Sequence, residues 1–375
     1  MRSQSIPRLL VVVTALLSIS CASGGERVEG ERLAVRTAVR EAYQELPGVV
    51  LSDRHFALEG EIHATVAAPD TATARAAIEA GFAAADSVEG LVDLHRRGSE
   101  VSAINAAAGE EPVVVSPWTE TIVAASLDWA ERTEGAFDPT VGPLMSAWGF
   151  GCEECVAPDS ARVRSALARV GWEKVRYDPE AHTVFLTEPG MALDLRAATK
   201  GFALDRMGEA IMDAGATAGI VDLGGDHLFF GPGTEGPENL WPVSLADPYD
   251  PGREFARLHV PAGALSMTSP YRRVVELTGG SVGHLIDPRT GWPATGLASV
   301  TVYARDAIQS DILSTGLFVL GQQRGCETIE GWRDIGAIFV FEPAPGEKSL
   351  VCVTPSLRGR VERLDPPFRP LVRDD

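Results

Sequence analysis

The sequence predicts an α/β chain with α+β character, in which mixed, largely antiparallel sheets pack against helices. Segments with apolar residues at helical spacing alternate along the chain with segments that resemble strands. Four short strand-like segments follow one another between residues 241 and 277, which is typical of antiparallel pairing. The chain has 375 residues, of which 45% are hydrophobic, so it can bury the core of one large domain or of two lobes.

Residues 1–20 have the pattern of a secretory signal. Arg2 and Arg8 precede an apolar run at residues 9–17, which is shorter than the roughly 20 residues that cross a bilayer. Cys21 resembles the lipid-modified cysteine of bacterial lipoproteins, with a plain secreted protein as the alternative. We therefore expect an exported protein that a lipid on Cys21 anchors to a bacterial membrane, facing the periplasm or the cell exterior.

The rest of the chain divides into a tether at residues 21–48, a folded domain at 49–355 and a peripheral tail at 356–375. A net charge of −19 and a pI near 4.8 argue against nucleic acid as a partner, because a phosphate backbone calls for a basic surface. Cys152 and Cys155 suit a local disulfide, which we favour, a redox pair or, with outside ligands, a metal.

The first half of the folded domain alternates helices with strands. Helical spacing and cap residues predict helices at residues 70–95, 116–132 and 159–170, the second of them capped by Ser116 with Pro117 in its first turn. Strands are expected at residues 54–66, 174–177 and 183–186. A Pro- and Gly-rich loop at residues 134–143 carries Asp138, and alone it would suit a turn that ends a helix.

The second half is richer in strands. Helices are expected at residues 197–214 and 306–320. Strands are expected at residues 191–195, 218–223, 241–246, 255–260, 264–267, 272–277, 298–304, 332–341 and 350–353. The strand at 218–223 ends in Gly224-Gly225, where backbone can approach a ligand closely.

The segment at residues 284–293 predicts a shaped loop. Pro288 fixes its own φ, and Gly291 can adopt a positive φ. His284 can carry a proton near neutral pH, and Arg289 can clamp an anion. The alternative is a turn whose polar side chains only satisfy nearby backbone groups.

Two helices carry candidate ligand groups. Asp194 leads into the N-terminus of the helix at 197–214, and Lys200 follows in its first turns, an arrangement that favours a phosphate-bearing ligand. Asp311 and Thr315 are four residues apart, so their oxygens share one side of a helix and suit Mg²⁺. As the alternative, Asp311 only favours the first helical turns and Thr315 bonds back to a carbonyl.

Six motifs in one order resemble the ApbE family, the FAD:protein FMN transferases formerly called thiamine biosynthesis lipoproteins. The resemblance covers about residues 50–345. Its motifs lie at residues 99–105, 135–144, 194–203, 221–226, 284–293 and 311–321. It implies an exported, Mg²⁺-dependent enzyme that cleaves FAD and attaches FMN through a phosphoester to Thr or Ser of a target protein, releasing AMP.

The resemblance also implies roles for individual residues. The FAD site would comprise His95, Ala136, Phe137, Asp138, Asp194, Lys200 and Leu285. The Mg²⁺ ligands would be Asp311, Thr315 and the carbonyl of Ala197. Lys200 and His284 would be catalytic, with Lys200 neutralising charge on the phosphates and His284 or a nearby carboxylate taking the proton of the acceptor hydroxyl. The ligand cleft would then lie between two halves of the chain.

Three positions depart from the family pattern. Arg196 replaces the usual glycine after Asp-Leu, Glu59-Gly60-Glu61 replaces Met-Gly-Thr, and Pro270 replaces a glycine. Arg196 would narrow the metal loop or add a phosphate contact. Two alternative functions share the same residues. One is an FAD diphosphatase that gives FMN and AMP, and the other is a flavin-binding lipoprotein without catalysis.

Overall fold

The computed structural model describes most of the chain beyond its N-terminal tenth. The described residues are 46, 48–94, 96–150, 156–271, 273–277, 280–330, 332, 334–344, 346–364 and 368–370. The expected signal, the lipid site at Cys21, the Cys152 and Cys155 pair and His95 lie outside them. Within the described residues, no helix is long and apolar enough to cross a membrane.

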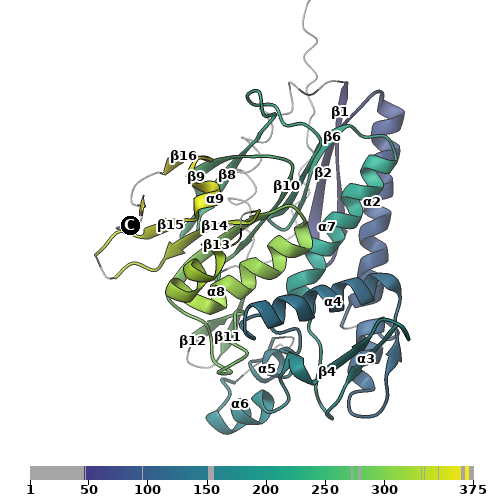
Figure 1. The fold of residues 1–375 in the computed structure, drawn as a ribbon, viewed down its shortest axis with the longest axis vertical. Coiled ribbons are helices and arrows are strands. Elements are labelled where there is room, and N and C mark those ends of the chain that lie inside the picture. The colour runs from purple at the N-terminus through teal and green to yellow at the C-terminus, as the bar shows by residue number, and fades with distance from the viewer. Residues whose placement is uncertain are drawn as a thin grey trace, which may run out of the picture.

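The fold is organised around one long sheet of nine strands, ordered β1-β2-β6-β7-β10-β13-β14-β15-β17 (Figure 1). Each neighbouring pair is antiparallel except β15 and β17, which confirms the largely antiparallel expectation. The strands are β1 Val49–Ala57, β2 Gly60–Ala68, β6 Ala218–Leu223, β7 Asp226–Phe230, β10 Gly263–Thr268, β13 Leu297–Ala304, β14 Gly336–Phe341, β15 Leu350–Val353 and β17 Arg369–Pro370.

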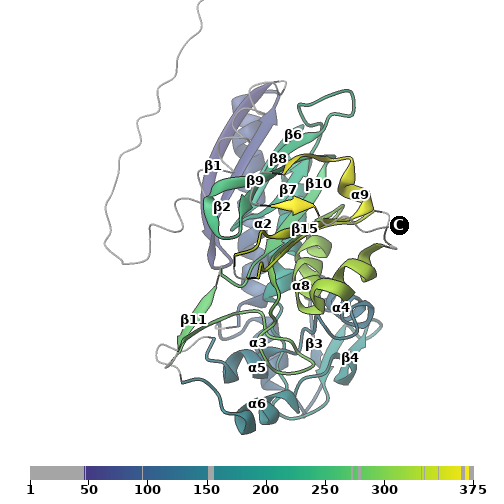
Figure 2. The ribbon, with the colours of Figure 1, turned by 90° about the vertical axis from the view of Figure 1, so that its left-hand side faces the viewer.

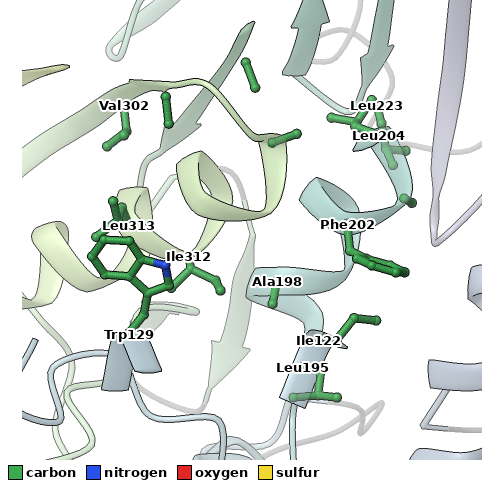
Figure 3. Close-up of a cluster of buried hydrophobic side chains, with 14 of the residues drawn as sticks. Ile122, Trp129, Leu195, Ala198, Phe202, Leu204, Leu223, Val302, Ile312 and Leu313 are labelled. Carbon is green, nitrogen blue, oxygen red and sulfur yellow. The ribbon is translucent and has the colours of Figure 1, made fainter. Parts of the chain in front are cut away.

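Three helices cover one face of this sheet: α2 Thr71–Val92, α7 Arg196–Asp213 and α8 Ala307–Glu330. A fourth, α4 Pro117–Arg132, packs against α7 and α8. Figure 3 shows the shared core, in which Phe202 of α7, Ile312 of α8 and Trp129 of α4 point into one cluster. Burying such side chains contributes about 1.5–3 kcal/mol each, so the core fixes the positions of α7 and α8.

The opposite face carries a three-stranded sheet, ordered β16-β9-β8 (Figure 2). Its strands are β8 Trp241–Asp247, β9 Asp250–Val260 and β16 Val361–Leu364. The alternation of side chains along β7 explains the two cores, since Leu228 and Phe230 pack among the helices while Phe229 packs against β8 and β9.

The segment after Pro355, for which we expected a peripheral tail, packs against the rest of the fold. It forms α9 Pro355–Arg358 and strand β16, which pairs with β9. Leu357 and Phe368 are buried in the core beneath β8 and β9. The apolar residues of this segment therefore complete that core.

Smaller elements gather at one end of the molecule (Figure 2). They include a sheet of β3 Val113–Val114, β5 Thr183–Leu186 and β4 Val175–Asp178, with the short helix η2 Trp172–Lys174. The short helices are α3 Glu100–Ala106, α5 Gly142–Ala147 and α6 Ser160–Leu167. A two-stranded ribbon, β11 Val274–Leu277 and β12 Gly280–Gly283, packs beside α5 and α6 through Val275, Leu277 and Val282.

Some expected elements differ in detail. The strand expected at 54–66 is a hairpin, because Leu58 and Glu59 adopt positive φ angles of 56° and 59° and turn the chain. The strand expected at 191–195 reduces to one bridge between Ala192 and Val141. Ser116 occupies the N-cap position of α4 as expected, but its side chain makes no capping hydrogen bond, and its hydroxyl donates to Glu100.

The span of α8 consists of two helical segments that meet at Gly321, whose φ of 81° and ψ of −174° lie outside the helical region. The first segment therefore ends at residue 320, as expected, and the second continues to Glu330. The expected strand at 332–341 begins four residues later, at Gly336.

Candidate functional site

Helices α7 and α8 approach each other closely at Gly201. A Cβ on Gly201 would lie 2.3 Å from the carbonyl oxygen of Ala307, so only glycine fits this crossing. Asp205, one turn later, accepts hydrogen bonds from the backbone N–H groups of Ala307 (2.7 Å) and Ile308 (2.9 Å). These bonds satisfy N–H groups that the start of α8 would otherwise leave unpaired.

The crossing also fixes Asp311. Its Oδ2 atom accepts a hydrogen bond of 2.9 Å from the N–H of Gly201. Burial raises the pKa of Asp311 to about 7, the Asp226 carboxylate adds to the increase, and Lys200 opposes it. A buried carboxylate in this state gains strongly from a nearby cation.

One pocket of about 510 Å³ opens beside this crossing. Each predicted site residue that the structure describes lines it: Ala136, Phe137, Asp138, Asp194, Ala197, Lys200, His284, Leu285, Asp311 and Thr315. They come from residues 136–138, the start of α7, the segment after β12, and α8. The structure thus brings together both halves of the chain, as we expected for the cleft.

Two ion pairs lie along the α7 wall of the pocket. Lys200 pairs with Asp226 at the start of β7, and Arg196 pairs with Asp194 through two N–H groups. Asn105 holds the chain just before Asp194, since its side-chain amide donates to the carbonyl of Leu193 (3.0 Å) and accepts from its N–H (2.7 Å).

Asp138 lines the pocket, but protein groups already occupy its carboxylate. Oδ1 accepts from the N–H (2.8 Å) and the hydroxyl (2.6 Å) of Thr140, and Oδ2 accepts from the N–H of Trp172 (3.0 Å). Burial nevertheless raises the pKa of Asp138 to about 6. These bonds indicate that Asp138 shapes the loop that presents Ala136 and Phe137.

His284 lies at the end of β12 with its ring oriented by Arg273. The carbonyl of Arg273 accepts from the backbone N–H of His284 (3.0 Å) and lies 3.2 Å from Nδ1. Burial lowers the pKa of His284 to about 4, and the charges of Arg273, Lys200 and Arg196 act in the same direction. The ring is therefore neutral at pH 7, and a proton on Nδ1 leaves Nε2 able to accept one.

The rest of the loop at residues 284–293 holds its own shape. Arg289 donates to both oxygens of Asp287, each at 2.9 Å, and to the carbonyl of Val319 (3.1 Å). Gly291 has the expected positive φ, 80°, and its carbonyl accepts from the indole of Trp148. Arg289 is thus tied to the loop and to α8, which favours the alternative that the polar side chains of the loop hold it in shape over the interpretation of Arg289 as an anion clamp.

Comparison with known proteins gives a consistent result. A model of the ApbE family matches residues 58–339. The chain belongs to the ApbE family. The FAD:protein FMN transferase of Treponema pallidum (strain Nichols) is 31% identical over 283 residues, which cover 72% of this chain and 78% of the relative. The enzyme of that description from Klebsiella pneumoniae (strain 342) is 33% identical over 254 residues, covering 67% and 78%.

A solved ApbE structure has the same fold. The ApbE protein of Thermotoga maritima MSB8 superposes with a TM-score of 0.71 at 27% identity, covering 84% of this chain and 97% of that chain. The family assignment and the mixed, largely antiparallel fold expected from the sequence are therefore confirmed.

The candidate metal ligands of this ApbE chain are oxygen atoms of mixed origin. Among the described residues, no cluster of three or more His, Cys, Asp or Glu side chains suits a metal ion. A cation beside Asp311 would therefore depend on the hydroxyl of Thr315 and the carbonyl of Ala197, two residues that line the same pocket. Such hard oxygen donors fit Mg²⁺, and the raised pKa of Asp311 indicates that the site favours a positive charge.

Sequence reasoning missed several residues of the pocket. Asp226 belongs to the motif at residues 221–226, but its pairing with Lys200 could not be predicted from the sequence, because this pairing depends on the β6–β7 hairpin. Arg273 and Glu59 form an ion pair of 3.2 Å between β11 and the β1–β2 turn, and both line the pocket. Glu59 was noted only as a departure, and its partner is more than 200 residues away.

Proposed function

We propose that the protein transfers FMN from FAD to a Thr or Ser hydroxyl of a target protein, with Mg²⁺ as cofactor, forming a phosphoester and releasing AMP. One observation carries the proposal most: a single pocket contains Asp311, Thr315, Lys200 and His284, which together suit phosphoryl transfer. The names of the two similar enzymes support flavin transfer in particular.

In this proposal Asp311, Thr315 and the Ala197 carbonyl hold Mg²⁺. When bound, the cation neutralises charge on the pyrophosphate oxygens. Lys200 adds a positive charge from α7, and its pairing with Asp226 keeps that charge at the pocket wall until phosphate arrives. Ala136, Phe137 and Leu285 supply apolar surface for the flavin.

His284 acts as the proton acceptor. Its Nε2 takes the proton of the acceptor hydroxyl while the hydroxyl oxygen bonds to the phosphorus of FMN. The bond from that phosphorus to the bridging oxygen breaks, and AMP leaves with the bridging oxygen. A histidine whose pKa lies near 4 is neutral at pH 7, so its Nε2 lone pair is free, and the negative charge of a bound pyrophosphate would raise this pKa and make the ring a stronger base.

The chain can be tested directly with full-length protein in detergent, FAD, Mg²⁺ and an acceptor peptide carrying a Ser/Thr motif. Peptide-bound flavin together with AMP would support transfer, and the same peptide with alanine in place of the hydroxyl residue is the control. Free FMN and AMP without bound flavin would identify a diphosphatase instead. Intact FAD throughout would contradict both reactions.

We also propose export and lipid anchoring at Cys21. The support is the sequence alone, namely the basic start, the short apolar run and the cysteine after small residues. Labelled palmitate should enter the protein in a bacterial host and should be lost in Cys21→Ala. Equal labelling of both forms would contradict the anchor.

A further inference from the structure

Arg196 has an unusual place in the pocket. It is the first residue of α7, and its side chain is 29% exposed and lines the pocket. Asp194, which is 6% exposed, receives hydrogen bonds from Nε and Nη2 of the guanidinium. Such a two-point bond fixes the plane of the guanidinium and therefore aims its remaining N–H groups.

Those remaining groups are available to a ligand. Among the residues that the structure describes, Arg196 donates its side-chain N–H groups only to Asp194, which uses two of the five. Both N–H groups on Nη1 and one on Nη2 are left. The guanidinium keeps its charge at any working pH, because an arginine side chain is not deprotonated in proteins.

Lys200 is the natural companion of Arg196. The two residues are four apart on α7, so their side chains lie on the same side of the helix, and both line the pocket. Asp226 holds Lys200 as Asp194 holds Arg196. Arg196 and Lys200, each held by its own carboxylate, therefore offer two neighbouring positive charges that can bind two linked phosphates.

We propose that Arg196 forms a second phosphate-binding position beside Lys200 and makes the pocket selective for a flavin with a diphosphate over one without phosphate. This inference rests on the proposed function. Asp194 then acts as a positioning residue, because its carboxylate is occupied by Arg196 instead of by the nucleotide.

The test measures flavin binding to the full chain in EDTA, where binding is read from flavin fluorescence without turnover. The variant Arg196→Lys keeps the positive charge but removes the planar guanidinium. The double variant Arg196→Met with Asp194→Asn removes the charges of both residues of the ion pair, so that no unpaired buried carboxylate is left. We expect both variants to bind FAD about 10-fold more weakly, since hydrogen bonds to charged groups contribute about that much. Riboflavin, which has no phosphate, should bind as it does to the wild type.

Arg206→Ala is the matched control. Arg206 is another arginine of α7, and it pairs with Glu209 and does not line the pocket. It should leave all affinities unchanged.

Each outcome bears on one of the two ideas. Equal losses for FAD and riboflavin, or no loss for FAD, would overturn the role of Arg196 while leaving the proposed function intact. If the wild type binds neither flavin in EDTA nor in the presence of Mg²⁺, the proposed function itself fails. A thermal unfolding midpoint within a few degrees of the wild type should accompany each binding measurement, so that a folding defect is not taken for a lost contact.

Discussion

The pocket has two walls that are held in place by different means. On one side, α7 and α8 touch backbone to backbone at Gly201, with Asp311 buried and Asp205 half-buried between them. On the other side, the loop at residues 284–293 is shaped by a surface ion pair and a glycine turn. The helical wall is thus fixed by close packing of two helix backbones, whereas the loop wall is fixed by hydrogen bonds within the loop and to Val319 and Trp148.

This difference separates the expected roles of the walls. A buried wall can hold a charge away from water at a fixed point, which suits a metal ion and phosphate. A loop wall that is partly exposed lets a bulky protein acceptor reach His284. Four predictions test the contrast, from the largest expected effect to the smallest.

Asp311→Asn removes the charge at the centre of the helical wall but keeps an acceptor for the Gly201 N–H. We expect the transfer rate to fall about 10³-fold, because charge stabilisation by a bound divalent cation is worth several kcal/mol. The folded protein should remain as stable as the wild type in EDTA. Rates measured against Mg²⁺ concentration would contradict the ligand role if the variant kept the wild-type dependence.

Gly201→Ala disturbs the packing between α7 and α8 in the helical wall. The added Cβ would meet the Ala307 carbonyl at 2.3 Å, with backbone on both sides, so we expect a loss of about 3 kcal/mol in the free energy of unfolding. Gly291→Ala is the matched change in the loop wall, where φ is 80° and the added Cβ would meet a side-chain methyl group of Val163 at 2.7 Å instead of backbone. It should lose about 1–2 kcal/mol. The free energy of unfolding of both variants is measured by urea unfolding. Equal losses would contradict the expected difference between the two walls.

His284→Gln tests the loop wall's chemistry. We expect a rate about 10²-fold lower at pH 7, which is typical for loss of a general base. The pKa of His284, followed by NMR of labelled histidine with the variant as assignment control, should be near 4. The neutral base is then present across the whole range above that value and is lost as the pH falls through it. A measured pKa of His284 near 6.5 would contradict the expected lowering of this pKa by burial.

Glu59→Gln should have the smallest effect. The Glu59–Arg273 pair is exposed at both ends, so its loss is worth about 0.2–1 kcal/mol at most. The apparent affinity for FAD should change by less than about fivefold, and high salt should reduce the difference further. A change of a hundredfold would mean that the pair controls entry to the pocket.

The sequence predicts the parts of the site that depend on local periodicity. Asp311 and Thr315 were placed by helical spacing, and the turn at Gly291 was placed by its glycine and neighbouring prolines. Pairings between distant residues could not be predicted, such as Lys200 with Asp226 or Asp205 with Ala307, because they exist only once the helices and strands have packed.

Two fold features escaped prediction for a related reason. The β1–β2 turn uses Leu58 and Glu59 in place of the Asn or Gly that usually marks such a turn. The strands after Pro355 are too short to show periodicity, and β16 is recognised only by its pairing with β9.

The bonds from Asp205 to the first turn of α8 also bear on how the chain reaches its native state. Their partners are 102 and 103 residues apart in sequence, so the α7–α8 junction cannot form by local folding. Contacts of such separation form slowly, because the intervening chain must first lose much of its freedom. The candidate cation site is therefore expected to be among the last regions to become ordered, once the β-strands between α7 and α8 are in place.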